Sequence, residues 1–272
     1  MSSSKTAISA DGTPIAFSAE GNGPPLILVE PAAHFRGFSA FTGLVPLLID
    51  RFTVITYDRR GRGESGDAAD YMPLREVEDL DAIIAAIGGP VLAYGYSSGA
   101  LLVLHAAAAG SAIRALALLE PPVELDRPPT GDPLTRELEA LLSEGRREAA
   151  VEHFHRAIGV PDDMIDAMRG TEAWSMMTKV APTLVHDCRI SEATTRELLA
   201  SVNVPSHVFD SAGGTDDLTG SAAAVARLLP DARHTSLEGE WHGVAPELIA
   251  AELIGFFGSH APADRREREG GT

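Results

Sequence analysis

The stretch from Val91 to Gly110 constrains the fold of this chain more than any other part of the sequence. It begins with the apolar run VLAY, which is too short for a helix and follows a Gly-Pro pair, a pattern typical of a buried strand. It ends with an alanine- and leucine-rich run that Gly110 closes, which predicts a buried helix. The two are joined by the letters GYSSG, a G-x-S-x-G pattern centred on Ser97.

The strand, turn and helix around Ser97 form the setting in which this pattern carries chemistry. A sharp turn holds its central residue in a strained backbone conformation, so the positions two before and two after must have almost no side chain, and Gly95 and Gly99 occupy them. The helix that follows points its N–H groups and its positive dipole end at an oxyanion formed beside Ser97. Without such a setting the letters would mark only a turn. Here they predict that Ser97 is a nucleophile.

Composition narrows the class of protein. A chain of 272 residues with 44% hydrophobic residues can form one large α/β domain with a sizeable core. The formal net charge of −17 argues against nucleic acid or an anionic membrane as a partner. The lone Cys188 has no partner for a disulfide and no neighbours for a metal site. No secretory signal or membrane-length apolar run is visible, so we expect a soluble cytoplasmic protein that binds a small-molecule substrate.

Strands and helices alternate through most of the chain, which predicts a mostly parallel sheet with helices on both faces. Eight segments read as strands: 6–9, 14–20, 26–29, 52–57, 91–94, 113–119, 206–209 and 233–237. Helices are expected at 39–49, 73–87, 100–109, 221–229 and 246–257. The predicted fold class is therefore α/β with an eight-stranded sheet.

Between residues 121 and 202 the sequence carries helical signals only, with a kink expected at Pro182. We interpret this segment as an inserted helical cap, which divides the core into residues 1–120 and 203–260. Residues 261–272 are charged and rich in glycine and proline, and we expect them to be disordered. Trp174 and Phe154 suit packing within the cap better than a pocket, but some cap residues must line whatever the cap covers.

The sequence resembles the α/β-hydrolase superfamily over nearly its whole length. The matching pieces are the N-terminal DGTPIAF, the loop YDRRGRGES, the elbow YGYSSG, the mid-chain cap and LEGEWHGV near the end. Within the superfamily the chain is similar to capped, cofactor-independent bacterial serine hydrolases. The sequence carries no ligand cluster and no dinucleotide fingerprint, so we expect no metal and no organic cofactor. It leaves the oligomeric state open.

The resemblance also implies a catalytic triad in the chain order serine, acid, histidine. Ser97 matches the nucleophile and His242 the general base. The acid is expected just after the strand at 206–209, where Asp216 fits the family's G-x-x-D register best and Asp217 fits it one residue later. Glu120 ends the preceding strand, where some relatives place their acid, and is the second choice.

The oxyanion hole is where this sequence departs from its family. The family usually has His-Gly after the strand at 26–29, whereas this chain has Glu30-Pro31. Proline has no N–H, but the donor position falls on Ala32, so Ala32 and Ser98 are the expected oxyanion donors. The arginines of the DRRGRG loop either brace the site, as in the family, or are solvated charges.

The activity that follows is hydrolysis of a small-to-medium, largely apolar ester, lactone or thioester through an acyl-enzyme on Ser97. Two alternatives stay open. The same fold and triad serve cyclases, C–C bond lyases and perhydrolases, and the fold also serves as a ligand receptor with vestigial turnover.

Overall fold

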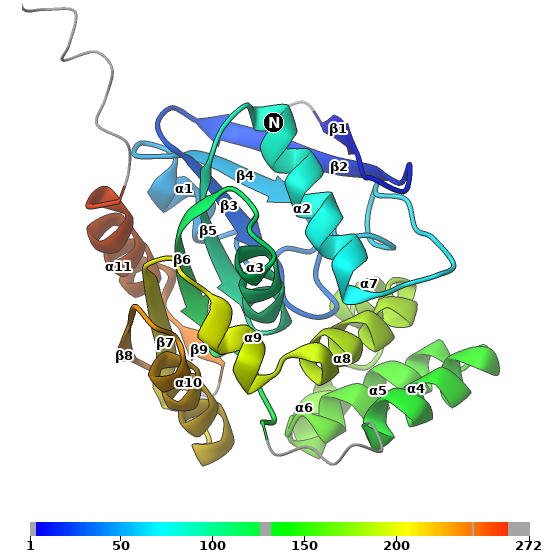
Figure 1. Ribbon diagram of the computed structural model, residues 1–272. Helices are drawn as coiled ribbons and strands as arrows, with labels where there is room; N and C mark the ends of the chain where they lie inside the picture. Colours follow the sequence, from blue (N-terminus) through cyan, green and yellow to red (C-terminus); the bar gives the residue numbers. More distant parts are fainter. Residues whose placement is uncertain (1–3, 126–131, 241, 261–272) are drawn as a thin grey trace, which may run out of the picture.

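A single twisted sheet lies at the centre of the protein (Figure 1). The computed structural model describes residues 4–125, 132–240 and 242–260. Within these residues nine strands pair in the order β1-β2-β4-β3-β5-β6-β7-β8-β9. Their bounds are β1 Lys5–Ile8, β2 Pro14–Gly21, β3 Pro25–Val29, β4 Thr53–Tyr57, β5 Val91–Tyr96, β6 Ile113–Leu119, β7 Ser206–Gly213, β8 Ala232–Glu240 and β9 Gly243–Val244.

The strands from β4 to β8 pair in parallel, while β1 and β2 at one edge and β9 at the other pair antiparallel. Parallel strands are covered on both faces, which explains why β3, β5 and β6 are almost continuously apolar. The α/β prediction is confirmed, and each of the eight predicted strands is present. The two-residue β9 carries too short a pattern to be predicted.

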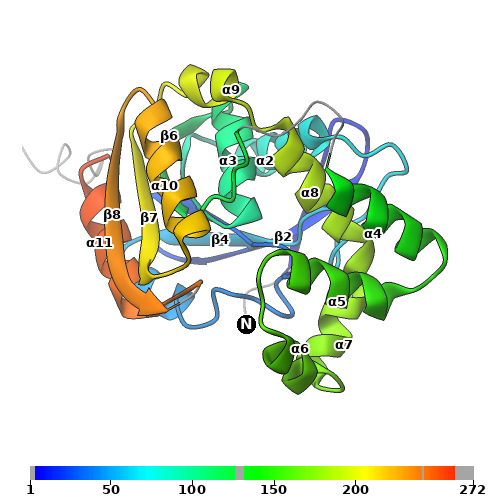
Figure 2. The ribbon, with the colours of Figure 1, turned by 90° about the horizontal axis from the view of Figure 1, so that it is seen from below.

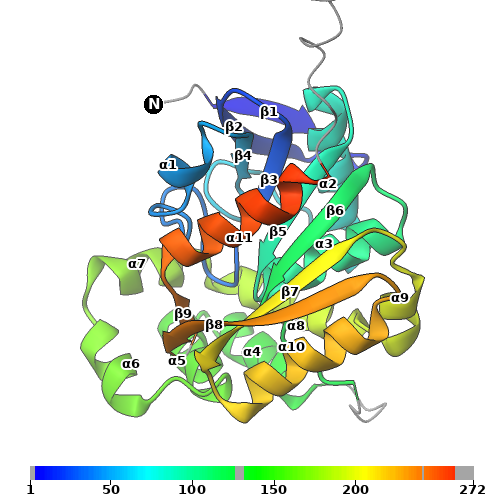
Figure 3. The same ribbon diagram turned by 90° about the vertical axis from the view of Figure 1, so that its left-hand side faces the viewer.

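Helices cover both faces of the sheet. The helices α2 (Pro73–Ile87), α3 (Ser98–Ala108) and α10 (Asp216–Leu228) pack on one face, where their apolar side chains form one buried cluster with the strands. The helices α1 (Val45–Leu48) and α11 (Pro246–Gly258) share the other face and a second cluster, as Figure 3 shows. Buried α3 follows β5 directly, which places the elbow at the carboxyl end of a central strand.

Two helix predictions need correction. The expected helix at 39–49 is only the single turn α1, because Pro46 lacks an N–H and is tolerated only in a first helical turn. The helix expected at 221–229 begins earlier, at Asp216, with Thr215 as its N-cap residue. Residues expected in the loop before this helix therefore belong to its first turn.

Six α-helices lie between β6 and β7 in the described residues, and we call residues 133–201 the helical insertion. They are α4 Pro133–Ser143, α5 Arg147–Ala157, α6 Asp162–Met168, α7 Glu172–Lys179, α8 Leu184–Ala193 and α9 Arg196–Ser201. Figure 2 shows α4 to α7 gathered at one side of the molecule, away from α10 and α11. The kink expected at Pro182 is confirmed as a short 3-10 turn, Ala181–Thr183, between α7 and α8.

An apolar cluster holds the helical insertion together and joins it to the loop after β3. Trp174, Phe154 and Met177 are buried in this cluster, and Ala33 of the loop is buried with them. No helix in the described part of the chain combines the length and the apolar character needed to cross a bilayer. The expected disorder of residues 261–272 falls outside the described residues.

Candidate active site

The turn at Ser97 has the strained geometry that the sequence pattern predicts. Ser97 joins β5 to α3 with φ 53° and ψ −122°. A Cβ atom on Gly95 would lie 2.5 Å from the Cα of Ala100, and one on Gly99 would lie 2.2 Å from the carbonyl oxygen of Val29. Both positions therefore require glycine, because backbone atoms cannot move aside as a flexible side chain can.

Among the side chains that the structure describes, the carboxylate that contacts His242 is that of Glu120. Glu120 directly follows β6 and is fully buried, and its Oε2 hydrogen bonds to Nδ1 of His242. Its Oε1 accepts from the backbone N–H of Ser211 at 2.9 Å and from the Ser211 hydroxyl at 2.5 Å. Burial acts to raise the pKa of Glu120, but the hydrogen bonds from His242 and Ser211 outweigh it and lower that pKa. Glu120 is thereby held as a carboxylate.

The contacts that the structure describes favour Glu120 over Asp216, the first choice from sequence, as the acid that orients His242. Nδ1 of His242 bonds to Glu120, the second choice from sequence. Asp216 is the first residue of α10, and the side chains of Asp216 and Asp217 lie outside what the structure describes. The position of Glu120, immediately after a buried strand, was the signal in the sequence that pointed to this acid.

Several contacts tie the elbow, Glu120 and His242 into one site. The backbone N–H of Ser97 donates to the carbonyl oxygen of Leu119, the residue before Glu120, at 2.8 Å. The Tyr96 hydroxyl donates to the carbonyl oxygen of His242 at 2.5 Å, and the two rings meet edge to face with centroids 5.4 Å apart. Since Tyr96 immediately precedes Ser97, the loop that carries His242 is anchored beside the nucleophile.

Backbone strain within the described residues concentrates at this site. Four non-glycine residues have a positive φ: Ala33 at 60°, Ser97 at 53°, Glu120 at 45° and His242 at 52°. This conformation costs an ordinary residue on the order of 1–3 kcal/mol and persists only where the surrounding structure enforces it. Three of the four are the serine, the acid and the histidine of the candidate triad, and the fourth lies in the loop after β3.

The two expected oxyanion donors belong to the first residue of α3 and to the loop after β3. Ser98 is the first residue of α3, and neither its N–H nor that of Ala32 donates a hydrogen bond to any residue that the structure describes. The close approach of Val29 to Gly99 brings the end of β3, and with it the loop that holds Ala32, against the first turn of α3. The positive end of the α3 dipole adds to the preference for an anion there.

The arginines of the DRRGRG loop are buried, which excludes the solvated alternative. Arg59, Arg60 and Arg62 are each at most 1% exposed. Arg60 bonds to Asp79 and Asp11, while Arg59 and Arg62 both reach Asp187 in α8. Sequence reasoning missed Asp187, because a single aspartate within an amphipathic helix carries no distinguishing signal.

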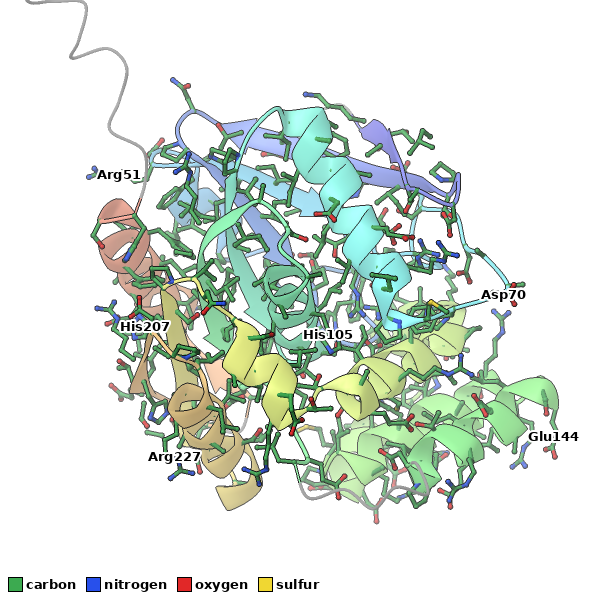
Figure 4. The ribbon with its side chains drawn as sticks, viewed as in Figure 1. Arg51, Asp70, His105, Glu144, His207 and Arg227 are labelled. Carbon is green, nitrogen blue, oxygen red and sulfur yellow. The ribbon has the colours of Figure 1, made fainter. Side chains whose placement is uncertain are left out.

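Two other buried histidines and the lone cysteine take no part in the contacts described above. His105 lies in α3 and His207 in β7 (Figure 4). His105 hydrogen bonds to Thr194, while His207 hydrogen bonds to Thr235 and packs against Phe256 of α11. Burial lowers the pKa of both histidines to about 4, so each is a neutral residue of the packed interior. Burial raises the pKa of Cys188 to about 12, which leaves an unreactive thiol.

Both the sequence and the fold have relatives among known proteins. Residues 26–252 match the sequence profile of the alpha/beta hydrolase family. The chain is 32% identical to the pimeloyl-[acyl-carrier protein] methyl ester esterase of Stenotrophomonas maltophilia over 262 residues, which span 90% of this chain and 96% of that relative. Among solved structures, an alpha/beta hydrolase from Sphaerobacter thermophilus matches with a TM-score of 0.85 and 43% identity, over 93% of this chain and 100% of that chain.

A thermophilic esterase from Thermogutta terrifontis matches with a TM-score of 0.76, over 96% of this chain and 100% of that chain. Its sequence is 20% identical to this chain, so the similarity shows a shared fold and no more. The profile covers most of the sequence, and the more similar relatives align along nearly their whole length. The chain therefore belongs to the alpha/beta hydrolase family.

Proposed function

We propose that this alpha/beta hydrolase cleaves carboxylic esters through an acyl-enzyme on Ser97, with His242 as general base and Glu120 as the acid that orients it. The hydrogen bond between Glu120 and Nδ1 of His242 carries the proposal. A carboxylate on Nδ1 keeps the proton on that nitrogen, so Nε2 is the nitrogen that accepts a proton from Ser97. The strained elbow and the anchoring of His242 through Tyr96 support the same pairing.

The reaction follows from these roles. Ser97 Oγ attacks the ester carbonyl while Nε2 of His242 takes its proton, and the N–H groups of Ala32 and Ser98 stabilise the tetrahedral oxyanion. His242 then gives the proton to the leaving alcohol, and the C–O bond to that alcohol breaks. Water attacks the acyl group on Ser97 with His242 again as base, which releases the acid and restores the serine.

The substrate we propose is a small-to-medium, largely apolar ester, lactone or thioester. The loop after β3 supports this choice, because Ala33 is buried among apolar residues of the helical insertion and Phe35 and Phe38 pack against the same cluster. Arg59 and Arg62 are buried and ion-paired, so they offer no charge to an acidic substrate. The name of the 32% identical relative supports an ester with a small alcohol, and methyl esters are therefore among the probes.

The test is hydrolysis of methyl and p-nitrophenyl esters of increasing acyl length in H₂¹⁸O. We expect one ¹⁸O atom in the released acid, and we expect Ser97→Ala to lower kcat by about 10³-fold or more while the fold is retained. Ser143→Ala, at the end of α4, is the matched control and should keep full activity. Acid without ¹⁸O, with the label in the alcohol, would indicate attack of water at the alkyl carbon and would contradict an acyl-enzyme. Tight binding without turnover would indicate a ligand receptor.

A further inference from the structure

Asp187 of the helical insertion makes a set of contacts that the reaction above does not use. Its side chain is 2% exposed, although it lies far along the chain from the elbow. Oδ1 accepts from the Ser98 hydroxyl at 2.7 Å and from Nη1 of Arg59 at 2.7 Å, and Oδ2 accepts from Nη2 of Arg62 at 2.7 Å. One carboxylate thus joins the first residue of α3 to two arginines of the loop after β4.

Arg62 carries the connection to the other side of the oxyanion hole. Its Nη1 donates to the carbonyl oxygen of Pro31 at 2.7 Å and to that of His34 at 3.1 Å. The Pro31 carbonyl belongs to the same peptide group as the N–H of Ala32, and that group is planar. A hydrogen bond that fixes the carbonyl oxygen therefore fixes the direction of the N–H, and it also polarises the group towards stronger donation.

Arg59 links the same carboxylate of Asp187 to the end of β3 and to α2. Its Nη1 donates to the Glu30 carbonyl at 3.4 Å, and its Nε and Nη2 grip Glu76 of α2 in a two-bond pair at 2.7 and 2.8 Å. The two arginines and the two carboxylates balance in charge, and all four side chains are at most 2% exposed. Such a buried network is held tightly, because the loss of one member leaves its partner's charge uncompensated.

We propose that Asp187 is the positioning residue of the oxyanion hole, since it fixes the Ser98 N–H through the serine hydroxyl and the Ala32 N–H through Arg62. The helical insertion thereby sets the geometry that stabilises the transition state. This inference rests on the proposed function of the site. An oxyanion donor acts where charge develops, so a misaligned donor lowers kcat and leaves substrate binding largely unchanged.

The direct test is Asp187→Asn, which keeps the size of the side chain but removes the charge that holds the arginines. We expect kcat to fall about 10- to 100-fold with KM within about threefold. Affinity for a trifluoromethyl ketone, which forms a tetrahedral oxyanion on the serine, should fall by the same factor as kcat/KM. A buried group that served packing alone would not produce this split.

Asp79→Asn is the matched control. Asp79 is also buried and binds Arg60 of the same loop with two hydrogen bonds, but Arg60 makes no hydrogen bond to the loop after β3 within the described residues. Both variants should lower the free energy of unfolding, whereas only Asp187→Asn should lower kcat of the folded protein. Equal losses of kcat, or a rise in KM with kcat unchanged, would overturn the proposal.

Ser98→Ala keeps the test decisive if Asp187→Asn does not fold. It removes a single hydroxyl that donates to Asp187 at 2.7 Å, and we expect kcat to fall about 3- to 10-fold at unchanged KM. Unchanged kcat in Ser98→Ala would refute the tie between Asp187 and the α3 donor. If the wild-type protein instead lacks a reactive Ser97, the proposed function itself fails, which separates the two outcomes.

Discussion

Glu120 at the end of β6 holds Nδ1 of His242, a residue 122 positions further along the chain. The sequence favoured an acid after β7 instead. Strands β6 and β7 are parallel neighbours, so their carboxyl ends meet at the same edge of the sheet, and an acid on either can reach the loop after β8. The N–H and the hydroxyl of Ser211, on β7, bind the second oxygen of Glu120 and so support the acid from the neighbouring strand.

This relationship predicts which acid is essential. Glu120→Gln should lower kcat by about 10³- to 10⁴-fold, because an amide cannot stabilise the imidazolium or hold the correct tautomer. Asp216→Asn and Asp217→Asn are the controls, and each should cost roughly tenfold or less. Steady-state rates on one ester decide between them. If Asp216→Asn were inactive while Glu120→Gln stayed active, Asp216 would be the acid that orients His242.

The elbow glycines predict a steric effect on stability. Gly99→Ala would bring a Cβ to 2.2 Å from the Val29 carbonyl oxygen and 2.7 Å from that of Glu30, so the sheet or α3 must shift. We expect a loss of about 1–3 kcal/mol or more in the free energy of unfolding, measured in urea, together with loss of activity. Gly255→Ala in α11 meets open space and should instead gain about 0.5–1 kcal/mol. Similar values for both variants would contradict the geometry.

Glu30 predicts a pH dependence of stability. Its carboxyl group is buried, contacts the Ser39 hydroxyl and accepts from the Ala40 N–H at 3.1 Å, and burial raises its pKa to about 7. The folded protein therefore binds this proton more tightly than the unfolded chain, so its stabilising contribution is complete below the unfolded pKa. It declines as pH rises from about 4.5 to about 7.

Glu30→Gln removes this titration and keeps the shape of the side chain. Relative to the wild type, the variant should gain about 1–3 kcal/mol in the free energy of unfolding when pH rises from about 5 to about 8. Urea titrations at the two pH values measure it, with exposed Glu144→Gln as the control. If the difference in the free energy of unfolding between the variant and the wild type is the same at both pH values, Glu30 does not titrate in this range.

Trp174 is expected to act through packing. It is buried in the core of the helical insertion with Phe154 and Met177, so Trp174→Ala should lower the free energy of unfolding by about 3–5 kcal/mol. Rates on short and long esters should then fall together as the folded fraction falls. Met164→Ala, an exposed residue of α6, is the control. A change in preference among acyl lengths, with stability unchanged, would instead identify Trp174 as part of the pocket.

Most of the fold could be predicted from the sequence, because burial alone sets the apolar pattern of the strands and of the longer helices. Short apolar runs such as those of β3 and β5 are typical of strands inside a parallel sheet. The glycines of the elbow are required because a side chain would clash with the backbone there. The exceptions have physical reasons as well. Pro46 shortened α1, and Thr215 began α10 earlier than its apolar face indicated.

The site was only partly predictable, because its remaining parts depend on contacts between distant segments. Ser97 and His242 follow local patterns, but the choice among Glu120, Asp216 and Asp217 depends on which carboxylate reaches Nδ1. The network of Arg59, Arg62 and Asp187 spans more than 120 positions along the chain and leaves no periodic signal. Such pairings follow from the sheet order and from the docking of the helical insertion, which only the three-dimensional structure supplies.

The identity of the nucleophile is the central claim, and fluorophosphonate labelling followed by peptide mapping tests it most directly. The reagent phosphonylates an activated serine, so one label should appear on Ser97 and disappear in Ser97→Ala, while Ser143→Ala labels as the wild type does. A label on Ser98, or labelling that persists in folded Ser97→Ala, would contradict the assignment of Ser97 as nucleophile.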